Sequence, residues 1–151
     1  MLRATNTLLR RRNVAPSKEQ ELQEVMHDYM RAAFPGDFTK TPQVNGVIKN
    51  FKPDCGILSI GAAVEFKIVH TEEAAVAAFS GVVEDTAGYK GSKDWTRFYA
   101  VVFQGEPFIS ESEIRSDMQR IKAGTWKAIL VNGKTTPRKK TGAKKAARSS
   151  K

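Results

Sequence analysis

Residues 52–69 read KPDCGILSIGAAVEFKIV, and this stretch predicts two strands joined by a tight turn. The segments Pro53–Leu58 and Ala62–Val69 are rich in apolar and β-branched residues, which favour strands. Between them lie Ser59, Ile60 and Gly61, and a short connection that contains glycine is typical of a hairpin. We therefore expect a β-hairpin at the centre of the fold.

Two charged residues stand out on the second strand of this hairpin. Side chains alternate between the faces of a strand, so Glu65 and Lys67 point the same way. The rest of 62–69 is apolar, as in a strand covered on both faces, and charges buried there need partners. Asp54 is one partner. If the turn has an even number of residues, the hairpin pairs Asp54 directly with Glu65 in one register or with Lys67 in the other. In either register Asp54 lies within about 5–8 Å of both side chains. Gly56 lies on that face too and leaves room for an approaching group.

Two carboxylates at this separation repel each other unless a cation lies between them. Oxygen ligands at an open site favour Mg²⁺ or Mn²⁺ over zinc. A lysine beside such an ion can position or deprotonate a water, or neutralise a phosphate. The alternative is a salt-bridged patch on a half-exposed sheet face, with Lys67 pairing with Asp54 and Glu65, since such pairs are common on solvated strands. The residues alone leave both interpretations open.

Outside the hairpin, the hydrophobic period alternates between helical and extended segments. A helix opens at Pro16-Ser17 and ends at Pro35-Gly36, with an apolar stripe at helical spacing. The other expected elements are strands at 44–51, 53–58, 62–69, 97–103 and 126–131, and helices at 71–87 and 110–121. The order α-β-β-β-α-β-α-β predicts an α/β protein with a mixed central sheet flanked by helices.

Charge is distributed unevenly along the 151 residues, which carry a net charge of +9. Residues 1–18 hold five bases and no acid, residues 134–151 hold eight bases and no acid, and all 16 acids lie between these ends. We therefore expect a basic N-terminal arm at 1–16, a folded domain at 17–133 and a disordered basic tail at 134–151. Basic ends on an acidic core suggest a polyanionic partner, although such tails can also confer solubility alone.

Composition narrows the class of protein further. A hydrophobic fraction of 40% and a charged fraction of 27% are typical of a soluble globular domain. Apolar runs are too short to span a bilayer, so we expect no membrane association. The single cysteine, Cys55, excludes an internal disulfide and fits a reducing compartment, cytoplasmic or nucleoid-associated. The arginines and leucines of the first 17 residues also resemble a weak mitochondrial transit peptide.

Asp54, preceded by Pro53 and followed after ten residues by Glu65-Phe66-Lys67, resembles the signature of the PD-(D/E)XK, or restriction-endonuclease-like, nuclease superfamily. The order of elements is also similar to the core of that family. The resemblance implies a restriction-endonuclease-like fold and a phosphodiesterase that depends on Mg²⁺ or Mn²⁺. It further implies that Asp54, Glu65 and the main-chain carbonyl of Phe66 bind the metal, while Lys67 activates or orients the attacking water.

Many members of that family add a glutamate from the first helix. On a helical wheel Glu19 lies nearer the apolar stripe than Glu21, so Glu19 is the candidate and Glu21 the reserve. The resemblance also suggests a phosphate contact from the pair Tyr89-Lys90. Together with the basic ends, the candidate nucleic-acid-binding residues are Lys90, Lys93, Arg10, Arg11, Arg12, Arg138, Lys139, Lys140, Lys144 and Lys145.

These observations predict a divalent-metal-dependent DNA endonuclease, structure-selective or weakly sequence-selective, that acts as a homodimer. The alternatives are a Holliday-junction resolvase and a non-catalytic nucleic-acid-binding protein on the same fold. Other residues of chemical interest receive structural interpretations. His27 is expected to be exposed, His70 incidental, Cys55 a small buried hydrophobe, and Trp95 a core or rim residue rather than a base-stacking one. Alanines within 74–78 are expected to pack closely on the sheet or across a dimer axis.

Overall fold

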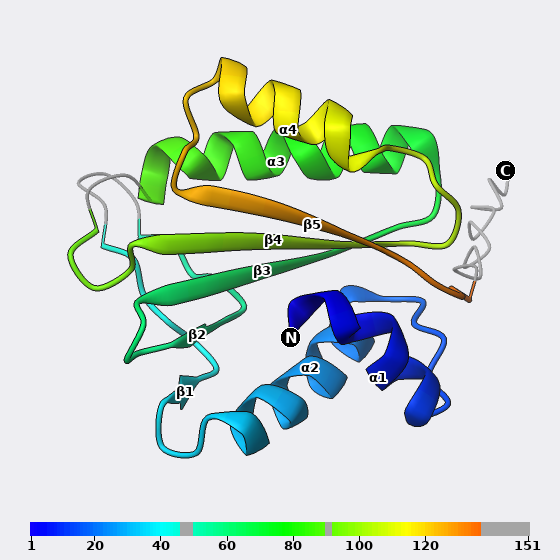
Figure 1. Cartoon of the computed structure of the whole chain (residues 1–151), viewed down its shortest axis with the longest axis horizontal. Coiled ribbons are helices and arrows are strands. Elements are labelled where there is room, and N and C mark those ends of the chain that lie inside the picture. The colour runs from blue at the N-terminus through cyan, green and yellow to red at the C-terminus, as the bar shows by residue number, and fades with distance from the viewer. Residues whose placement is uncertain (46–49, 90–91, 137–151) are drawn as a thin grey trace, which may run out of the picture.

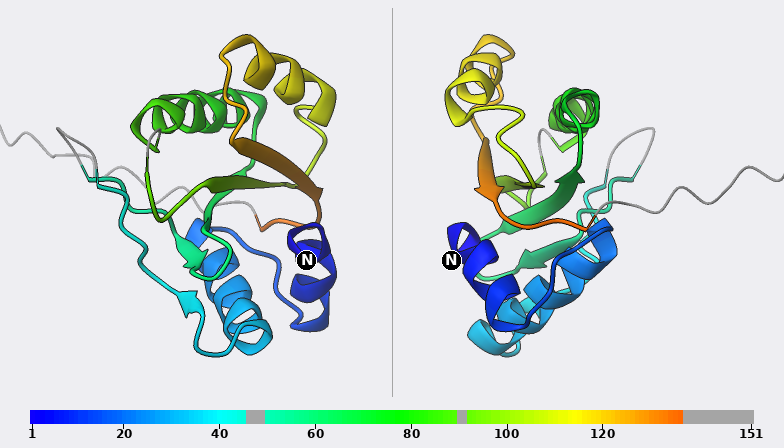
Figure 2. Two further views of the ribbon diagram at one scale, coloured as in Figure 1. Left: turned by 60° about the vertical axis from the view of Figure 1, so that its left-hand side comes forward. Right: turned by 90° about the vertical axis from the view of Figure 1, so that its right-hand side faces the viewer.

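The computed structural model describes residues 1–45, 50–89 and 92–136. It has an α/β architecture in which a five-stranded open sheet lies between two layers of helices (Figures 1 and 2). The strands follow the sheet in chain order: β1 (Phe38–Thr39), β2 (Cys55–Ile57), β3 (Ala62–Val69), β4 (Arg97–Gln104) and β5 (Trp126–Asn132). The pairs β1–β2 and β2–β3 are antiparallel, whereas β3–β4 and β4–β5 are parallel. The sheet is therefore mixed. β3 is antiparallel to its neighbour β2 and parallel to its other neighbour, β4.

Helices cover both faces of the sheet. The short 3₁₀ helix η1 (Leu2–Ala4), α1 (Thr5–Arg11) and α2 (Glu19–Ala33) lie on one face, and α3 (Glu72–Tyr89) and α4 (Glu111–Arg120) lie on the other (Figure 1). Parallel neighbours cannot be joined by a hairpin, so α3 and α4 serve as the crossovers from β3 to β4 and from β4 to β5. From α2 onward the order of elements is the predicted α-β-β-β-α-β-α-β.

Local patterns place most of these elements correctly. The expected helices and the last two strands agree with α2, α3, α4, β4 and β5 to within about two residues, the usual uncertainty of such boundaries. The predicted capping box is present, since Ser110 accepts from the Glu113 N–H and the Glu113 side chain accepts from the Ser110 N–H. The predicted stripe of α2 is buried at Leu22 and Met26.

The strand expected at 44–51 is wrong. Val44 and Phe51 form only an isolated antiparallel bridge, and residues 46–49 lie outside the described part of the chain. The first strand is β1 instead, which follows α2 after a turn at Gly36 with a φ of 78°. A tertiary contact holds this segment on the sheet, because Asp37 accepts from the Ser59 N–H at 2.7 Å. Local periodicity contains no trace of that contact.

The expected arm at 1–16 belongs to the folded domain. Leu9 is 1% exposed and packs in the same core cluster as Leu22, Met26 and Phe66. After α1 the chain turns through Asn13, whose φ of 53° is a left-handed conformation that asparagine tolerates well. One buried leucine among exposed arginines is a weak periodic signal, so composition alone suggested an arm.

The expected tail also begins later than position 134. Thr136 donates through its N–H to the Pro16 carbonyl at 3.2 Å and through its hydroxyl to the Ala15 carbonyl at 2.9 Å. Residues 134–136 therefore lie against the N-terminal segment, and the remaining tail, 137–151, lies outside the described residues.

Leu9→Ala should lower the free energy of unfolding by about 2–5 kcal/mol, because it removes a fully buried side chain and leaves a cavity. Urea denaturation followed by circular dichroism measures the effect. Thr7→Ala, on an exposed position of the same helix, is the control and should change stability by no more than about 0.5 kcal/mol. A Leu9→Ala protein as stable as the parent would contradict the assignment of α1 to the core.

No helix within 1–45, 50–89 and 92–136 combines the length and apolar character that crossing a membrane requires.

Candidate active site

The candidate site is built on β3. Its two charged side chains, Glu65 and Lys67, alternate with the fully buried Phe66 and are 13% and 22% exposed. The strand lies inside the sheet, where Glu65 is paired with Ala100 of β4. Both charges are therefore held on a rigid backbone and are largely but not completely removed from water.

Asp54 immediately precedes β2. The observed register pairs Cys55 with Val64, which is the one of the two expected registers that places position 54 across from position 65. Asp54 also accepts the N–H of Phe66 through its Oδ2 at 2.7 Å. The Asp54 carboxylate thus accepts a β3 backbone N–H. This bond holds the carboxylate beside Glu65.

Helix α2 supplies the fourth member of the site. Lys67 Nζ lies 2.8 Å from Glu65 Oε1 and 3.9 Å from Oε2 of Glu19, the first residue of α2. Glu21 is used differently, because its carboxylate accepts the Ser17 N–H at 2.7 Å and so binds the chain entering the helix. The structure therefore brings Glu19, and not Glu21, to Lys67.

One further contact comes from α2 and was missed from the sequence. The Gln23 side chain lies close to Asp54 and favours its ionised form. Gln23 lies four residues after Glu19, so the two side chains lie on the same face of the helix. This i, i+4 spacing could have identified Gln23 from the sequence. It was missed because only the acidic residues of the helix were placed on the helical wheel.

The carboxylates of the site resist ionisation. Burial raises the pKa of Asp54 above its ordinary value, and the Phe66 N–H and the charge of Lys67 oppose this only in part. Burial, followed by the charge of Asp54, raises the pKa of Glu65 to about 7, although the hydrogen bond from Lys67 favours its ionised form. For Lys67, burial lowers the pKa, but Glu65, Glu19 and Asp54 together outweigh it and raise the value. One ammonium group therefore does not fully compensate the negative charge gathered here.

The donor set fits a hard divalent cation. Asp54 and Glu65 contribute carboxylate oxygens and Phe66 a carbonyl oxygen, which is the chemistry that Mg²⁺ and Mn²⁺ prefer. The described residues contain no preassembled group of three or more His, Cys, Asp or Glu side chains that could hold a metal ion. Mg²⁺ does not need such a cage, since it keeps several waters and commonly uses one or two carboxylates with substrate phosphates.

Two expectations about the surroundings of the site are wrong. The space beside Gly56 is filled, because a Cβ at that position would lie 2.5 Å from the ring of Trp95. Trp95 itself is 5% exposed, which confirms it as a core residue. Tyr89 is 3% exposed and packs against Phe98 with ring centroids 4.9 Å apart, so it does not contact phosphate. A tyrosine in an aromatic core and one at a surface look alike in sequence.

The histidines differ from each other in role. His27 is 5% exposed rather than exposed, because its ring packs against Phe38 and Phe66 with centroids 5.5 and 6.4 Å away. Burial lowers its pKa. His70 lies after β3 and donates through Nε2 to the Ser17 carbonyl at 3.2 Å, which ties the end of β3 to the start of α2.

The expectations for Cys55 and the alanines are confirmed. Cys55 is completely buried among Val64 and Phe66, and burial raises the pKa of its thiol well above the ordinary value. Ala75 is 1% exposed and packs against Val69 and Val102 of the sheet, which is one of the two packing interpretations given above.

Four of the candidate nucleic-acid-binding residues lie in the part of the chain that the structure describes, and they belong to two separate segments. Lys93 is exposed and precedes Asp94, whose carbonyl lies beside Gly61, the residue before β3. Arg10, Arg11 and Arg12 are exposed on α1 and the residue after it. The other basic candidates lie outside the described residues: Lys90, Arg138, Lys139, Lys140, Lys144 and Lys145.

Comparison with known proteins adds no relative: no family model, no curated protein and no solved structure matches this chain. The class is therefore defined by the fold and the site alone, an α/β protein with an open mixed sheet and a carboxylate–lysine cluster on its central strand.

Proposed function

We propose that this protein is a divalent-metal-dependent DNA endonuclease with a restriction-endonuclease-like fold, structure-selective or weakly sequence-selective. The observation that carries the proposal is the meeting of Asp54, Glu65 and Lys67 with Glu19. These groups come from the start of β2, from β3 and from α2, so the cluster is a product of the fold and not of one surface strand.

The burial of the cluster favours catalysis over a salt-bridged patch. A solvated Glu–Lys pair on a sheet would keep an ordinary carboxylate, whereas Glu65 is 13% exposed with a pKa of about 7. Burying such a group costs stability, because desolvation is only partly offset by its partner. Perturbed carboxylates of this kind are concentrated at functional sites.

The position of each group agrees with the resemblance to the PD-(D/E)XK superfamily. The aspartate adjoins the second strand of the sheet, the Glu-x-Lys segment lies on the third, and a glutamate comes from the helix before them. The sheet changes from antiparallel to parallel at that third strand, as the predicted order of elements requires.

In the proposed mechanism Asp54, Glu65 and the Phe66 carbonyl would hold Mg²⁺ or Mn²⁺. The ion would supply Lewis-acid chemistry, activating a water and stabilising charge on the scissile phosphate. The Lys67 ammonium would orient the attacking water or neutralise charge on the phosphate. Glu19, 3.9 Å from Lys67 Nζ, and Glu65, at 2.8 Å, would hold that ammonium in position.

The test is a cleavage assay on supercoiled plasmid, linear duplex and a four-way junction, each with Mg²⁺, Mn²⁺ or EDTA. We expect nicking with either metal and none with EDTA. Preference for the junction would select the resolvase subtype. Binding without cleavage in either metal would overturn the proposal in favour of a non-catalytic nucleic-acid-binding protein.

Cleavage at subsaturating Mg²⁺ should rise about tenfold per pH unit between about pH 5.5 and 7, and then level off. The reason is that metal binding needs the ionised carboxylate, and the pKa of Glu65 is raised to about 7. Saturating metal should move the midpoint to lower pH, since it favours the ionised form. A flat profile across this range at low metal concentration would contradict the assignment of Glu65 as a ligand.

A further inference from the structure

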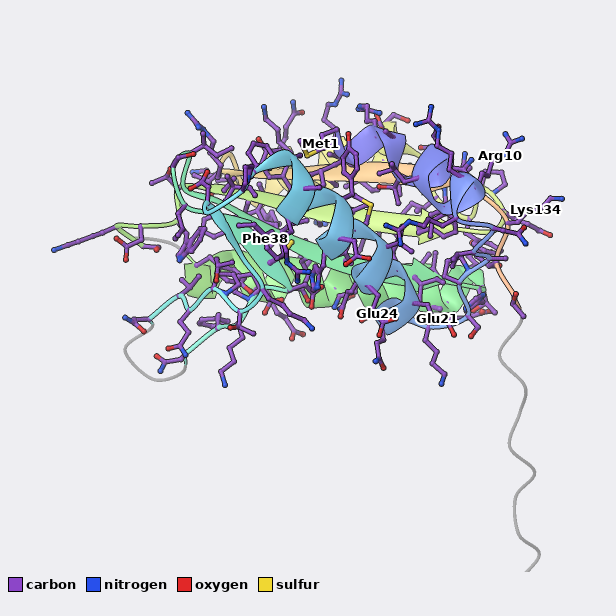
Figure 3. All side chains as sticks on the ribbon, turned by 90° about the horizontal axis from the view of Figure 1, so that it is seen from below. Met1, Arg10, Glu21, Glu24, Phe38 and Lys134 are labelled. Carbon is purple, nitrogen blue, oxygen red and sulfur yellow. The ribbon has the colours of Figure 1, made fainter. Side chains whose placement is uncertain are left out.

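A hollow of about 680 Å³ opens between α1 and the ends of β4 and β5. Arg10 of α1 and Lys134, just after β5, both line it, and Figure 3 shows these two residues at the same end of the molecule. Asn6, Asn13 and Asn132 also line it. We call these five residues the basic groove.

Local geometry fixes the walls of the basic groove. A Cβ at Gly133 would lie 2.6 Å from Asn6 Oδ1 and 2.5 Å from the Phe103 ring, so only glycine lets β5 approach α1 this closely. Asn132 Oδ1 accepts a hydrogen bond from Gln104 Nε2 at 2.8 Å. The Asn132 amide nitrogen can therefore donate to another group. The groove is thus a product of the folded N-terminal helix and would not exist if residues 1–16 were an arm.

The charges of the groove select an anion. Its lining residues include two cations and no Asp or Glu, although residues 19–133 hold four more acids than bases. The adjoining hollow, which shares Lys134, is lined by Glu72, Glu73 and Glu106. A negatively charged chain would therefore be attracted to the first hollow and repelled from the second.

The groove adjoins the chain segment that enters α2, the helix that begins with Glu19. The Ala15 carbonyl beside it binds Thr136, the Ser17 carbonyl two residues on binds His70 at the end of β3, and Glu19 follows. Figure 3 shows Glu21, in the first turn of α2, at the same end of the molecule as Arg10 and Lys134. Lys134 is also the first of the eight bases of residues 134–151.

We propose that the basic groove binds consecutive phosphates of the DNA backbone, with Arg10 and Lys134 as the charged contacts. This inference rests on the proposed nuclease function for its choice of DNA as the polyanion. A groove of this volume exceeds the needs of one phosphate ion, and cations interspersed with amide donors are the usual partners of a nucleic-acid backbone.

The experiment measures binding of the full-length protein to a short fluorescein-labelled duplex by anisotropy in EDTA, where no cleavage occurs. The variant is R10Q together with K134Q. The matched control is R115Q together with K127Q, which removes the same charge from exposed positions around a different hollow that also contains Glu111. Thermal unfolding by circular dichroism checks that both proteins remain folded.

We expect the groove variant to bind about tenfold more weakly, and its log–log salt slope to fall by about 1.8, because two phosphate contacts are lost. The control should change affinity by less than about twofold. Equal losses in the two variants, or no loss in the groove variant, would overturn the groove as the binding site. Because binding is measured without metal, a parent protein that binds through the groove but never cuts would refute the nuclease proposal and not this one.

Discussion

Replacing Glu65 by glutamine should reduce metal-dependent DNA cleavage by about 10³-fold or more. Glutamine keeps the size of the side chain and can still accept the hydrogen bond from Lys67, which lies 2.8 Å away. It removes one of the two carboxylates that would hold the metal. Loss of several kcal/mol of charge stabilisation corresponds to at least this fall in rate.

The measurement is the initial rate of plasmid nicking over a range of Mn²⁺ concentrations. Metal affinity should fall with the rate, because the same carboxylate serves both. Glu21→Gln is the matched control, since Glu21 contacts Ser17 at the start of α2 and does not reach Lys67. It should retain the parent rate to within a few-fold, with a small loss of stability from the weakened helix entry. A Glu65→Gln protein that cuts like the parent would exclude this cluster as the active site.

Substitution of Lys67 by methionine should reduce cleavage by about 10²–10³-fold, the usual cost of removing one group that stabilises or orients reacting charge. Methionine retains the length of the apolar stem, which matters because the lysine side chain is only 22% exposed. Unlike Glu65→Gln, this change removes no metal ligand. Binding of Mn²⁺, followed by isothermal titration, should therefore persist while the rate falls.

The pH profile gives Lys67→Met a second signature. The Lys67 ammonium lowers the pKa of Glu65 through its hydrogen bond and charge, opposing the effect of burial. Its removal should move the midpoint of metal-dependent cleavage to higher pH. Lys127→Met, an exposed lysine on β5, should change neither the rate nor the midpoint. An unchanged midpoint in Lys67→Met would mean that the two groups are not coupled as the structure indicates.

The hairpin illustrates how far sequence reasoning reaches. The alternation of 62–69 and the glycine-containing turn were enough to predict β3 and the face shared by Glu65 and Lys67, which the structure confirms. They left two registers open for Asp54, and the structure has the one that pairs Cys55 with Val64. Register depends on contacts at both ends of the hairpin, such as the bond from Ser59 to Asp37, and these are not local.

The first strand and the N-terminal helix show where such reasoning ends. Residues 44–51 have a strand-like composition, yet within the described residues Val44 and Phe51 form only an isolated bridge, while the two residues of β1 pair with β2. Leu9 directly precedes three arginines, and its burial in one cluster with Leu22 and Met26 of α2 shows that the N-terminal segment belongs to the domain. Short segments carry little periodic signal, so tertiary packing decides their state.

The sequence by itself determined the α/β class, the helix at α2, the order of elements from β2 onward, and the presence of Glu65 and Lys67 on one face of a buried strand. Those features follow from periodicities of two and 3.6 residues, which any stretch of chain carries within itself. Only the tertiary structure decided that Glu19 reaches Lys67, that Gln23 lies close to Asp54, that Tyr89 is buried, and that α1 and Lys134 form a basic groove. Each of these depends on residues far apart in the chain meeting at a distance set by packing, and no local pattern encodes that distance.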